Sequence, residues 1–359
     1  MNKKIFIFTG GTGGHVIPAV NFGNFLIQNG YECFLSLDLR GHKYAKNFEG
    51  KKFLVKSSHF SGNIFYKIKS FINLILGFLQ IFFILIKIRP SNCISFGSYA
   101  TFAPMLSSMI LKKFINASVY IHEQNSIIGK VNLIYLPFIK NIFSNFNTLN
   151  NLKLKFSDKM ISVGLPSRSS VNLKIFKKKI DHNNITIFIY GGSQGSLKII
   201  ELFLSILSNL ENNIIKNINL VIQSPKELHL SINKSMSVFK IKYKLQEFFF
   251  NIEEILSITD VAISRGGAGT INDLIKYRIP SIIFPISNSV YNHQYLNAKI
   301  LLDINAAIVL DENNFDSIKG AEVFSDLINN KNKYTLMKKS LEKIKVLDAN
   351  RIMLDTIYE

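Results

Sequence analysis

The chain has 359 residues, which is enough for two domains that each bury a sizeable core. Its 47% hydrophobic and 19% charged residues exclude a disordered chain, and its two cysteines exclude a disulfide scaffold and fit a reducing cytoplasm. The formal net charge of +19 admits nucleic acid or anionic lipid as a partner, although a chain so rich in lysine also reaches this charge through biased composition alone.

The first half alternates short apolar runs with stretches of helical length, which is typical of a parallel α/β sheet. The N-terminal apolar run passes directly into glycines, so we expect no signal peptide. The predicted strands of this half are Ile5 to Phe8, Cys33 to Leu37, Asn92 to Phe96, Val119 to His122 and Asn141 to Ser144.

One segment, "KIKSFINLILGFLQIFFILIKIRP" from Lys67 to Pro90, has membrane character. Its apolar part, residues 71–86, is shorter than the roughly 20 residues of a membrane span. Basic residues lie at both of its ends. We therefore expect a helix that lies on an anionic membrane surface through the segment from Lys67 to Arg89, with a buried core helix as the alternative.

The polar, basic stretch from Gly164 to Asn184 separates two halves of similar plan. After it, the strand "ITIFIY" runs into "GGSQGS" and a helix, and further strands are predicted at Asn219 to Ile222, Asp260 to Ser264 and Ser281 to Phe284. We predict two doubly wound domains, residues 1–164 and 165–340, whose glycine-rich loops face one inter-domain cleft.

The first glycine-rich loop, "GGTGGH", is suited to phosphate. Glycines allow close approach of the backbone, and Pro18 is expected in the first turn of the following helix, whose N–H groups attract anions. A nicotinamide cofactor is disfavoured because Val16 replaces the third glycine of G-x-G-x-x-G, although Asp38 stands where a ribose-binding acid could lie. A tight turn without any ligand is the structural alternative.

Further polar side chains follow other strands. "SRGGAGTINDL" places Asp273 one turn into a helix, where it could accept hydrogen bonds from sugar hydroxyls, so we expect a nucleotide sugar. No D-x-D pair is present to hold a metal, so a helix N-terminus would stabilise the leaving diphosphate, and we expect neither metal nor cofactor.

His15, at the end of the first glycine-rich loop, is a candidate general base, with helix capping as the alternative. The polar cluster "HEQN" from His122 to Asn125 is expected at the same sheet edge as this loop.

Six motifs together resemble one family. They are "GGTGGHVIPA", "SFGSYATFAP", "HEQNSIIGKVN", "GGSQGS", "SRGGAGTINDL" and "VYNHQYLNA", and in this order they are similar to the MurG family of N-acetylglucosaminyltransferases over nearly the whole chain. The resemblance implies a GT-B fold of two Rossmann-like domains, with the acceptor and membrane side first and the donor side second. It also implies that a last helix, at about residues 341–359, packs back on the first domain.

The resemblance also implies site residues. UDP-N-acetylglucosamine would be bound by Arg168 and the backbone around Phe249 near the uracil, Ser193 at the phosphates, Ala268, Gly269 and Thr270 at a helix start, Asp273 on the ribose, and Gln294 with Asn297 on the sugar. On the acceptor side, Thr12, Gly13, Gly14, Tyr99 and Asn125 would lie near the lipid-linked diphosphate, with His15 as the base. Three residues depart from the family pattern: Leu165 replaces an asparagine, Ser98 a glycine and Asp273 a glutamate.

The implied reaction is a single inverting displacement, in which the C4 hydroxyl of undecaprenyl-diphosphate-linked N-acetylmuramyl-pentapeptide (lipid I) attacks the anomeric carbon and UDP leaves. The protein would lie on the cytoplasmic face of the inner membrane, with other cell-wall synthesis proteins as further partners and no nucleic acid. A UDP-N-acetylglucosamine 2-epimerase on the same fold would explain the loops, but it would need no membrane helix. A non-enzymatic membrane protein would leave the phosphate-type loops without a ligand.

Overall fold

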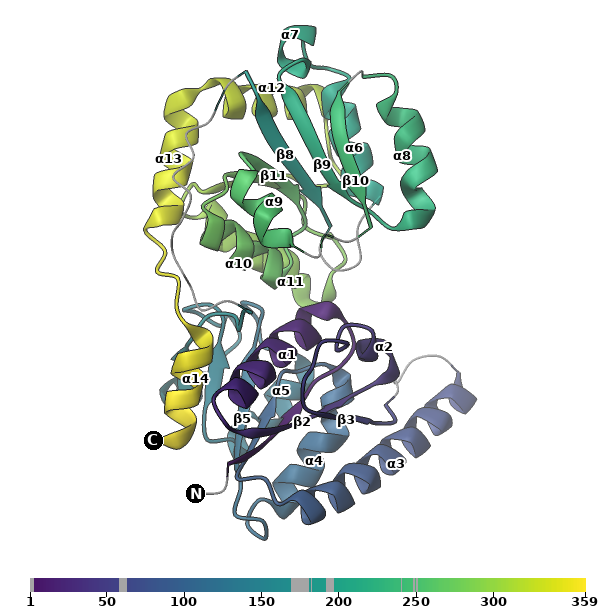
Figure 1. The fold of residues 1–359 in the computed structure, drawn as a ribbon, viewed down its shortest axis with the longest axis vertical. Helices are drawn as coiled ribbons and strands as arrows, with labels where there is room; N and C mark the ends of the chain where they lie inside the picture. Colours follow the sequence, from purple (N-terminus) through teal and green to yellow (C-terminus); the bar gives the residue numbers. More distant parts are fainter. Residues whose placement is uncertain are drawn as a thin grey trace. The chain divides into compact units, whose positions relative to one another are not determined.

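The computed structural model describes residues 3–57, 63–168, 181, 183–191, 197–239, 241–247, 249 and 251–359. It divides the chain into two compact units. The first comprises Met1–Val171 together with Leu347–Glu359, and the second comprises Asn172–Val346. Each unit is an α/β layer structure built on a parallel sheet (Figure 1).

The first unit is built on a seven-stranded sheet with the order β3-β2-β1-β4-β5-β6-β7, in which every strand pair is parallel. The expected doubly wound arrangement is confirmed, because strand order reverses beside β1. The strands are β1 (Lys4–Phe8), β2 (Glu32–Leu37), β3 (Lys51–Leu54), β4 (Asn92–Ser95), β5 (Ser118–Glu123), β6 (Ile142–Ser144) and β7 (Met160–Ser162).

Alternate residues of β1 explain why both faces of this sheet are covered. Ile5 and Ile7 belong to one apolar cluster, whereas Phe6 and Phe8 belong to another, and all four are fully buried. A strand with no polar face requires helices on both sides. The helical segments are α1 (Gly13–Gln28), α2 (Leu39–His42), α3 (Ile64–Ile88), η1 (Tyr99–Thr101), α4 (Phe102–Leu111), α5 (Lys130–Tyr135), η2 (Leu136–Phe138), η3 (Leu154–Lys159) and α14 (Ala349–Tyr358).

Helix α1 begins at Gly13, so Pro18 is its sixth residue, beyond the first turn in which we expected it. Proline has no N–H, and the Gly14 carbonyl therefore lacks the donor that a helix normally supplies from residue 18. Val16, Ala19 and Phe22 nevertheless bury the inner face of α1 against the sheet. Packing of this face compensates for the missing hydrogen bond.

Helix α14 comes from the end of the chain but belongs to the first unit, where it lies beside α1 (Figure 1). Met353 and Ile357 are buried in the same cluster as the inner face of α1. The rings of Tyr358 and Tyr31 lie 4.9 Å apart, and Asn350 Nδ2 donates to the Ser167 carbonyl at 2.8 Å. The core of the first unit thus includes the last residues of the chain.

Helix α3 is a surface helix, so the alternative of a fully buried core helix is wrong. Only Ser70, Gly77, Ile81 and Leu85 of its 25 residues are buried. Among the described residues it is the single helix long and apolar enough to cross a membrane, with a mean hydropathy of 2.3 over a window that is 17% buried. Length and composition alone do not distinguish a span from a helix that lies on a surface.

The second unit contains a six-stranded parallel sheet with the order β10-β9-β8-β11-β12-β13. Its strands are β8 (Ile185–Tyr190), β9 (Ile218–Gln223), β10 (Lys242–Gln246), β11 (Val261–Ser264), β12 (Ser281–Ile283) and β13 (Ala307–Val309). Its helical segments are α6 (Leu197–Leu207), α7 (Asn212–Ile215), η5 (Lys226–Leu228), α8 (His229–Met236), α9 (Ile252–Ile258), α10 (Ala268–Tyr277), η6 (Val290–Asn292), α11 (His293–Leu302), α12 (Ser317–Asn329) and α13 (Lys331–Glu342).

Four strands that sequence patterns did not predict lie at sheet edges: β3, β7, β10 and β13. The sequence of β10 is "KYKLQ", in which Lys242, Lys244 and Gln246 are polar and exposed, and β3 begins with two lysines. An edge strand needs only one covered face and is protected by charge, so it does not carry the continuous apolar run of a central strand. The other two strands have three residues each, too few for a pattern.

Candidate functional site

In the first unit, the candidate site residues follow β1, β4 and β5, which are neighbours in the sheet. The carboxyl ends of parallel strands meet at one edge, where α/β proteins bind ligands. Thr12 is the exposed N-cap of α1 and its side chain makes no capping hydrogen bond, Gly13 is buried and Gly14 is exposed. His15 is half-buried in the first turn, and its N–H donates to the Thr12 carbonyl at 3.1 Å.

Asp38, at the end of β2, holds the glycine-rich loop in place. Its Oδ1 accepts hydrogen bonds from the N–H groups of Gly11 at 2.8 Å and Gly41 at 2.9 Å, and its Oδ2 accepts one from the Tyr99 hydroxyl at 3.2 Å. The side chain is buried. Because these donors occupy the carboxylate, it is not available to a cofactor ribose, which agrees with the weak match to a dinucleotide loop.

Tyr99 is fixed between Asp38 and Arg40. The Arg40 guanidinium lies over the ring at 4.8 Å from its centroid, and burial together with the Asp38 charge raises the pKa of Tyr99 to about 12. The hydroxyl is therefore protonated at neutral pH and acts as a donor. Arg40 also brings a half-exposed positive charge to the glycine-rich loop.

Ser98 adopts a backbone conformation, φ 79° and ψ 151°, that favours glycine. This is the position where the sequence departs from a glycine of the family pattern. Ser98 Oγ accepts a hydrogen bond from the Ala100 N–H at 3.4 Å and its carbonyl accepts one from the Thr101 hydroxyl at 2.8 Å, so the strained residue begins the turn that presents Tyr99.

Buried Glu123 organises the turn after β5. Its Oε1 accepts from the Asn125 N–H at 3.1 Å and from Asn125 Nδ2 at 3.3 Å, while its Oε2 accepts from the Gly129 N–H at 3.0 Å and Asn132 Nδ2 at 2.9 Å. The carboxylate thus positions Asn125, which is half-buried, at the rim. Next to it, Gln124 Oε1 lies 2.8 Å from Nδ1 of His15.

In the second unit, α10 begins directly after the loop that follows β11. Ala268 and Thr270 are buried in its first turn, whereas Gly269 is half-exposed, and a Cβ added there would meet no atom within 4 Å. Half-buried Asp273 lies on the next turn, where burial raises the pKa of its carboxyl to about 7, partly opposed by the Lys276 charge. At neutral pH this carboxyl is therefore partly protonated.

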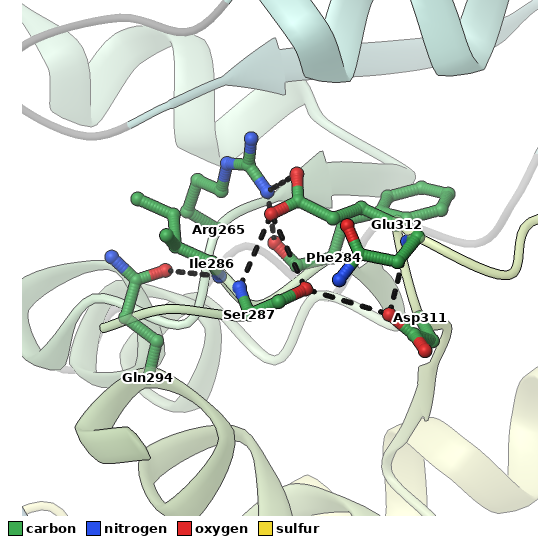
Figure 2. A network of polar contacts seen from close by, with 8 residues as sticks. Arg265, Phe284, Ile286, Ser287, Gln294, Asp311 and Glu312 are labelled. Carbon is green, nitrogen blue, oxygen red and sulfur yellow. Dashed lines mark hydrogen bonds and ion pairs between the residues drawn. The ribbon is translucent and has the colours of Figure 1, made fainter. Parts of the chain in front are cut away.

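A polar network surrounds the start of this loop (Figure 2). Arg265 Nη1 donates to Glu312 Oε2 at 2.6 Å and to the Phe284 carbonyl at 3.0 Å, and both side chains of the ion pair are largely buried. Glu312 Oε1 accepts from the Ser287 N–H at 3.1 Å. The network joins the segments that follow β11, β12 and β13 and so fixes their shape.

Gln294 and Asn297 of α11 contact the same loops. Gln294 Oε1 accepts from the Ile286 N–H at 3.1 Å, as Figure 2 shows, and Asn297 Nδ2 donates to the Gly266 carbonyl at 3.0 Å. Asn297 is fully buried. A Cβ at Gly266 would lie 2.1 Å from the Gln294 carbonyl oxygen, so glycine is required for this close packing.

The remaining predicted residues are placed as follows. Phe249 is buried, with its ring edge-on to Phe188 at 5.8 Å, and Lys244 lies over it. Arg168 is exposed and belongs to the first unit, beside a hollow of about 270 Å³ on the outer side of α1. Ser193 lies outside the described residues.

Sequence reasoning assigned no individual role to Glu123, Gln124, Arg265 or Glu312. Glu123, Gln124 and Arg265 stand inside the motifs that predict neighbouring site residues, so those motifs are the signal that points to them. Glu312 carries no such signal, because it follows an edge strand and meets Arg265 across 47 residues of chain. Only the fold brings it to the loop.

The two parallel sheets, with glycine-rich loops at the carboxyl ends of central strands, have the GT-B architecture. The chain matches the N-terminal domain of glycosyltransferase family 28 over residues 5–144 and its C-terminal domain over residues 186–351. The chain belongs to this family.

Similar curated proteins are known from Rickettsia. Those of Rickettsia canadensis and Rickettsia felis are 36% and 34% identical, each over 91% of both chains, and each is a UDP-N-acetylglucosamine–N-acetylmuramyl-(pentapeptide) pyrophosphoryl-undecaprenol N-acetylglucosamine transferase. Among solved structures, MurG of Acinetobacter baumannii has the same fold, with a TM-score of 0.79 and 19% identity over 99% of both chains.

Proposed function

We propose that this chain transfers N-acetylglucosamine from UDP-N-acetylglucosamine to undecaprenyl-diphosphate-linked N-acetylmuramyl-pentapeptide. The observation that carries the proposal is the 34–36% identity to transferases of this activity over 91% of both lengths, so both domains have a counterpart. The chain is then a hexosyltransferase of peptidoglycan synthesis, and its substrates are a soluble UDP-sugar and a lipid-linked sugar.

The acceptor is assigned to the first unit. Its C4 hydroxyl loses a proton to His15 while the oxygen bonds to the anomeric carbon, and the bond from that carbon to UDP breaks with inversion. Thr12, Gly13 and Gly14 at the start of α1 offer backbone donors to the lipid-linked diphosphate. Tyr99, protonated and held by Asp38, and Asn125, held by Glu123, supply further donors at the same edge.

The donor is assigned to the second unit. The N-terminus of α10, with Ala268, Gly269 and Thr270, faces the diphosphate in this proposal, and the open space above Gly269 supports close approach. Asp273 accepts hydrogen bonds from the ribose, and Gln294 contacts the sugar. Asn297 supports the loop through Gly266, and family resemblance adds Ser193 and the backbone at Phe249 to the site. The same resemblance assigns Arg168 to the donor, although this residue belongs to the first unit.

Helix α3 docks the protein on the cytoplasmic face of the membrane in this proposal. Its outer face exposes a continuous set of large apolar side chains, namely Ile64, Phe65, Tyr66, Ile68, Phe71, Ile72, Ile75, Leu76, Leu79 and Phe83. Lys67, Lys69, Lys87 and Arg89 are exposed near its ends, where they meet anionic headgroups.

The inner face of α3 supports docking over spanning. The Ser107 hydroxyl donates to the Phe78 carbonyl at 3.0 Å, Gln80 Nε2 donates to the Leu54 carbonyl at 2.6 Å, and Ile81 and Leu85 belong to the apolar cluster of the unit. A span would have to break these contacts, whereas a helix lying in the headgroup region keeps them. We also propose other cell-wall synthesis proteins as further partners of this positively charged chain.

The test is incubation of the purified chain with labelled UDP-N-acetylglucosamine, with and without the lipid-linked acceptor. Label in the lipid fraction only when acceptor is present supports the transferase. Epimerised sugar without acceptor would instead identify the 2-epimerase on the same fold. A donor that stays unchanged with and without acceptor would favour a non-enzymatic binding protein.

A further inference from the structure

A directed chain of hydrogen bonds joins His15 to the ends of β4 and β5. His15 Nδ1 lies 2.8 Å from Gln124 Oε1 and 3.0 Å from the Phe96 carbonyl oxygen. Gln124 Nε2 lies 2.9 Å from the same carbonyl oxygen, and His122 Nε2 lies 3.0 Å from the Gly164 carbonyl oxygen. Gln124, His122 and Phe96 are buried, so water does not compete for these groups.

The orientation of the Gln124 amide follows from its neighbours. Its Nε2 has two carbonyl oxygens within reach, those of Phe96 at 2.9 Å and His122 at 3.2 Å. An oxygen in that place would face two other acceptors, so the NH₂ group must occupy it. Oε1 therefore faces His15.

His122 adds a second constraint. Its Nε2 faces the Gly164 carbonyl oxygen and must donate, and burial lowers the pKa of His122 to about 4, so the ring is neutral at pH 7. In the neutral ring Nδ1 is then an acceptor, 3.2 Å from Gln124 Nε2. The ring also stacks on Phe96 at 4.9 Å, which fixes its plane.

His15 Nδ1 thus faces two acceptors, Gln124 Oε1 and the Phe96 carbonyl oxygen. A neutral imidazole carries one proton, and here that proton must be on Nδ1. Within the described part of the chain, both hydrogen bonds of the His15 ring are made by Nδ1, so Nε2 carries the lone pair.

We propose that Gln124, anchored by His122, is a positioning residue that holds the proton of His15 on Nδ1 and so makes Nε2 the basic nitrogen. The inference rests on the proposed function, in which His15 accepts the proton of the attacking hydroxyl. As Nε2 takes this proton, the ring becomes positive, and the two acceptors at Nδ1 stabilise it through charge-assisted hydrogen bonds. A neutral amide here does the orienting that a carboxylate does in a catalytic triad.

The first experiment reads the tautomer directly, by ¹⁵N NMR of the full chain with labelled histidine, and H15Q assigns the signals. We expect the wild-type ring to carry its proton on Nδ1 at pH 8. Gln124→Met keeps the volume but removes the acceptor, and should make the Nε2-protonated form detectable. Gln28→Met, the same change at an exposed glutamine of α1, should leave the spectrum unchanged.

The second experiment measures transfer against pH. Gln124→Met should lower kcat by about 10-fold with little change in either KM, and should move the acidic limb of the kcat profile to lower pH, because the protonated ring loses an acceptor. A merely structural role would lower the amount of folded enzyme without moving this limb. His122→Phe keeps the stacking on Phe96. It should shift the His15 tautomer and the acidic limb of the kcat profile in the same direction as Gln124→Met does.

A wild-type ring protonated on Nε2 would overturn the proposal, and that result needs no variant to fold. Unchanged tautomer and pH profile in folded Gln124→Met would also overturn it. Wild-type protonation on Nδ1 in a chain without transferase activity would instead contradict the proposed function and leave the tautomer assignment standing.

Discussion

At the scale of single residues, His15 carries the largest expected effect. His15→Ala removes the proposed base and should lower kcat by about 100-fold or more, with little change in the donor KM. Steady-state transfer assays measure this effect, and His42→Ala, at an exposed histidine of the same unit, serves as the control. A turnover close to that of wild type would remove His15 from the mechanism.

Ser98 stores strain, because a serine at φ 79° and ψ 151° occupies a conformation that costs about 1 kcal/mol or more for residues other than glycine. Ser98→Gly should therefore raise the free energy of unfolding of the first unit by about 1 kcal/mol, measured by urea denaturation. Ser157→Gly, in the 3₁₀ segment η3, should lower it. A loss of stability in Ser98→Gly would mean that the hydroxyl contacts outweigh the strain.

Asp273 should make the stability of the second unit depend on pH. Its folded pKa of about 7 lies above the ordinary value, so the folded state binds more protons and stability falls as pH rises from about 4 to 7. Asp273→Asn should therefore gain about 1 kcal/mol or more over wild type between pH 5 and 8, measured by thermal unfolding.

The control for Asp273→Asn is the same change at Asp303, an exposed aspartate of the second unit. The difference in stability between Asp303→Asn and wild type should stay the same from pH 5 to pH 8. If the stability curves of Asp273→Asn and wild type run parallel against pH, Asp273 does not take up a proton in this range. Because the protonated carboxyl accepts fewer hydrogen bonds, donor binding should also weaken below pH 7.

At the scale of elements, α3 gives the sharpest test. Leu79→Glu with Phe83→Glu places two charges on the outer face, where these side chains are 42% and 65% exposed, and should weaken binding to anionic vesicles by about 100-fold in sedimentation assays. Leu154→Glu, at a more exposed leucine of η3, is the matched control. Full retention by the double variant would exclude α3 as the docking surface.

Central elements could be predicted from sequence, and edges could not. β1 and β5 contain the apolar runs "IFIF" and "VYI", and β1, β4 and β5 run into glycine or polar motifs, whereas β3 and β10 carry lysines. The same difference holds for the candidate site. Asn125 and Asp273 are predicted from the motifs in which they stand, but a partner that fixes a loop across the fold, such as Glu312, is visible only in the three-dimensional structure.

At the scale of the whole molecule, α14 links the end of the chain to the first unit. Met353→Ala should cost the first unit about 2–5 kcal/mol, because Met353 is fully buried in that unit's core. In Met353→Ala, the amides of β1 should be less protected from hydrogen exchange than in wild type, and the amides of β8 should keep their protection. Met337→Ala, buried in the second unit, should show the reverse, and equal effects on both strands would mean that the units unfold together.

The position of α14 also makes the first unit discontinuous in sequence. Residues 172–346, which form the second unit, separate α14 from the rest of the first unit, so the core that α14 completes cannot close until the second unit has been synthesised. The part made first therefore finishes last. Until α14 docks, the apolar residues of the first unit that pack with Met353 and Ile357 stay exposed, and such surface makes an incomplete unit prone to aggregation.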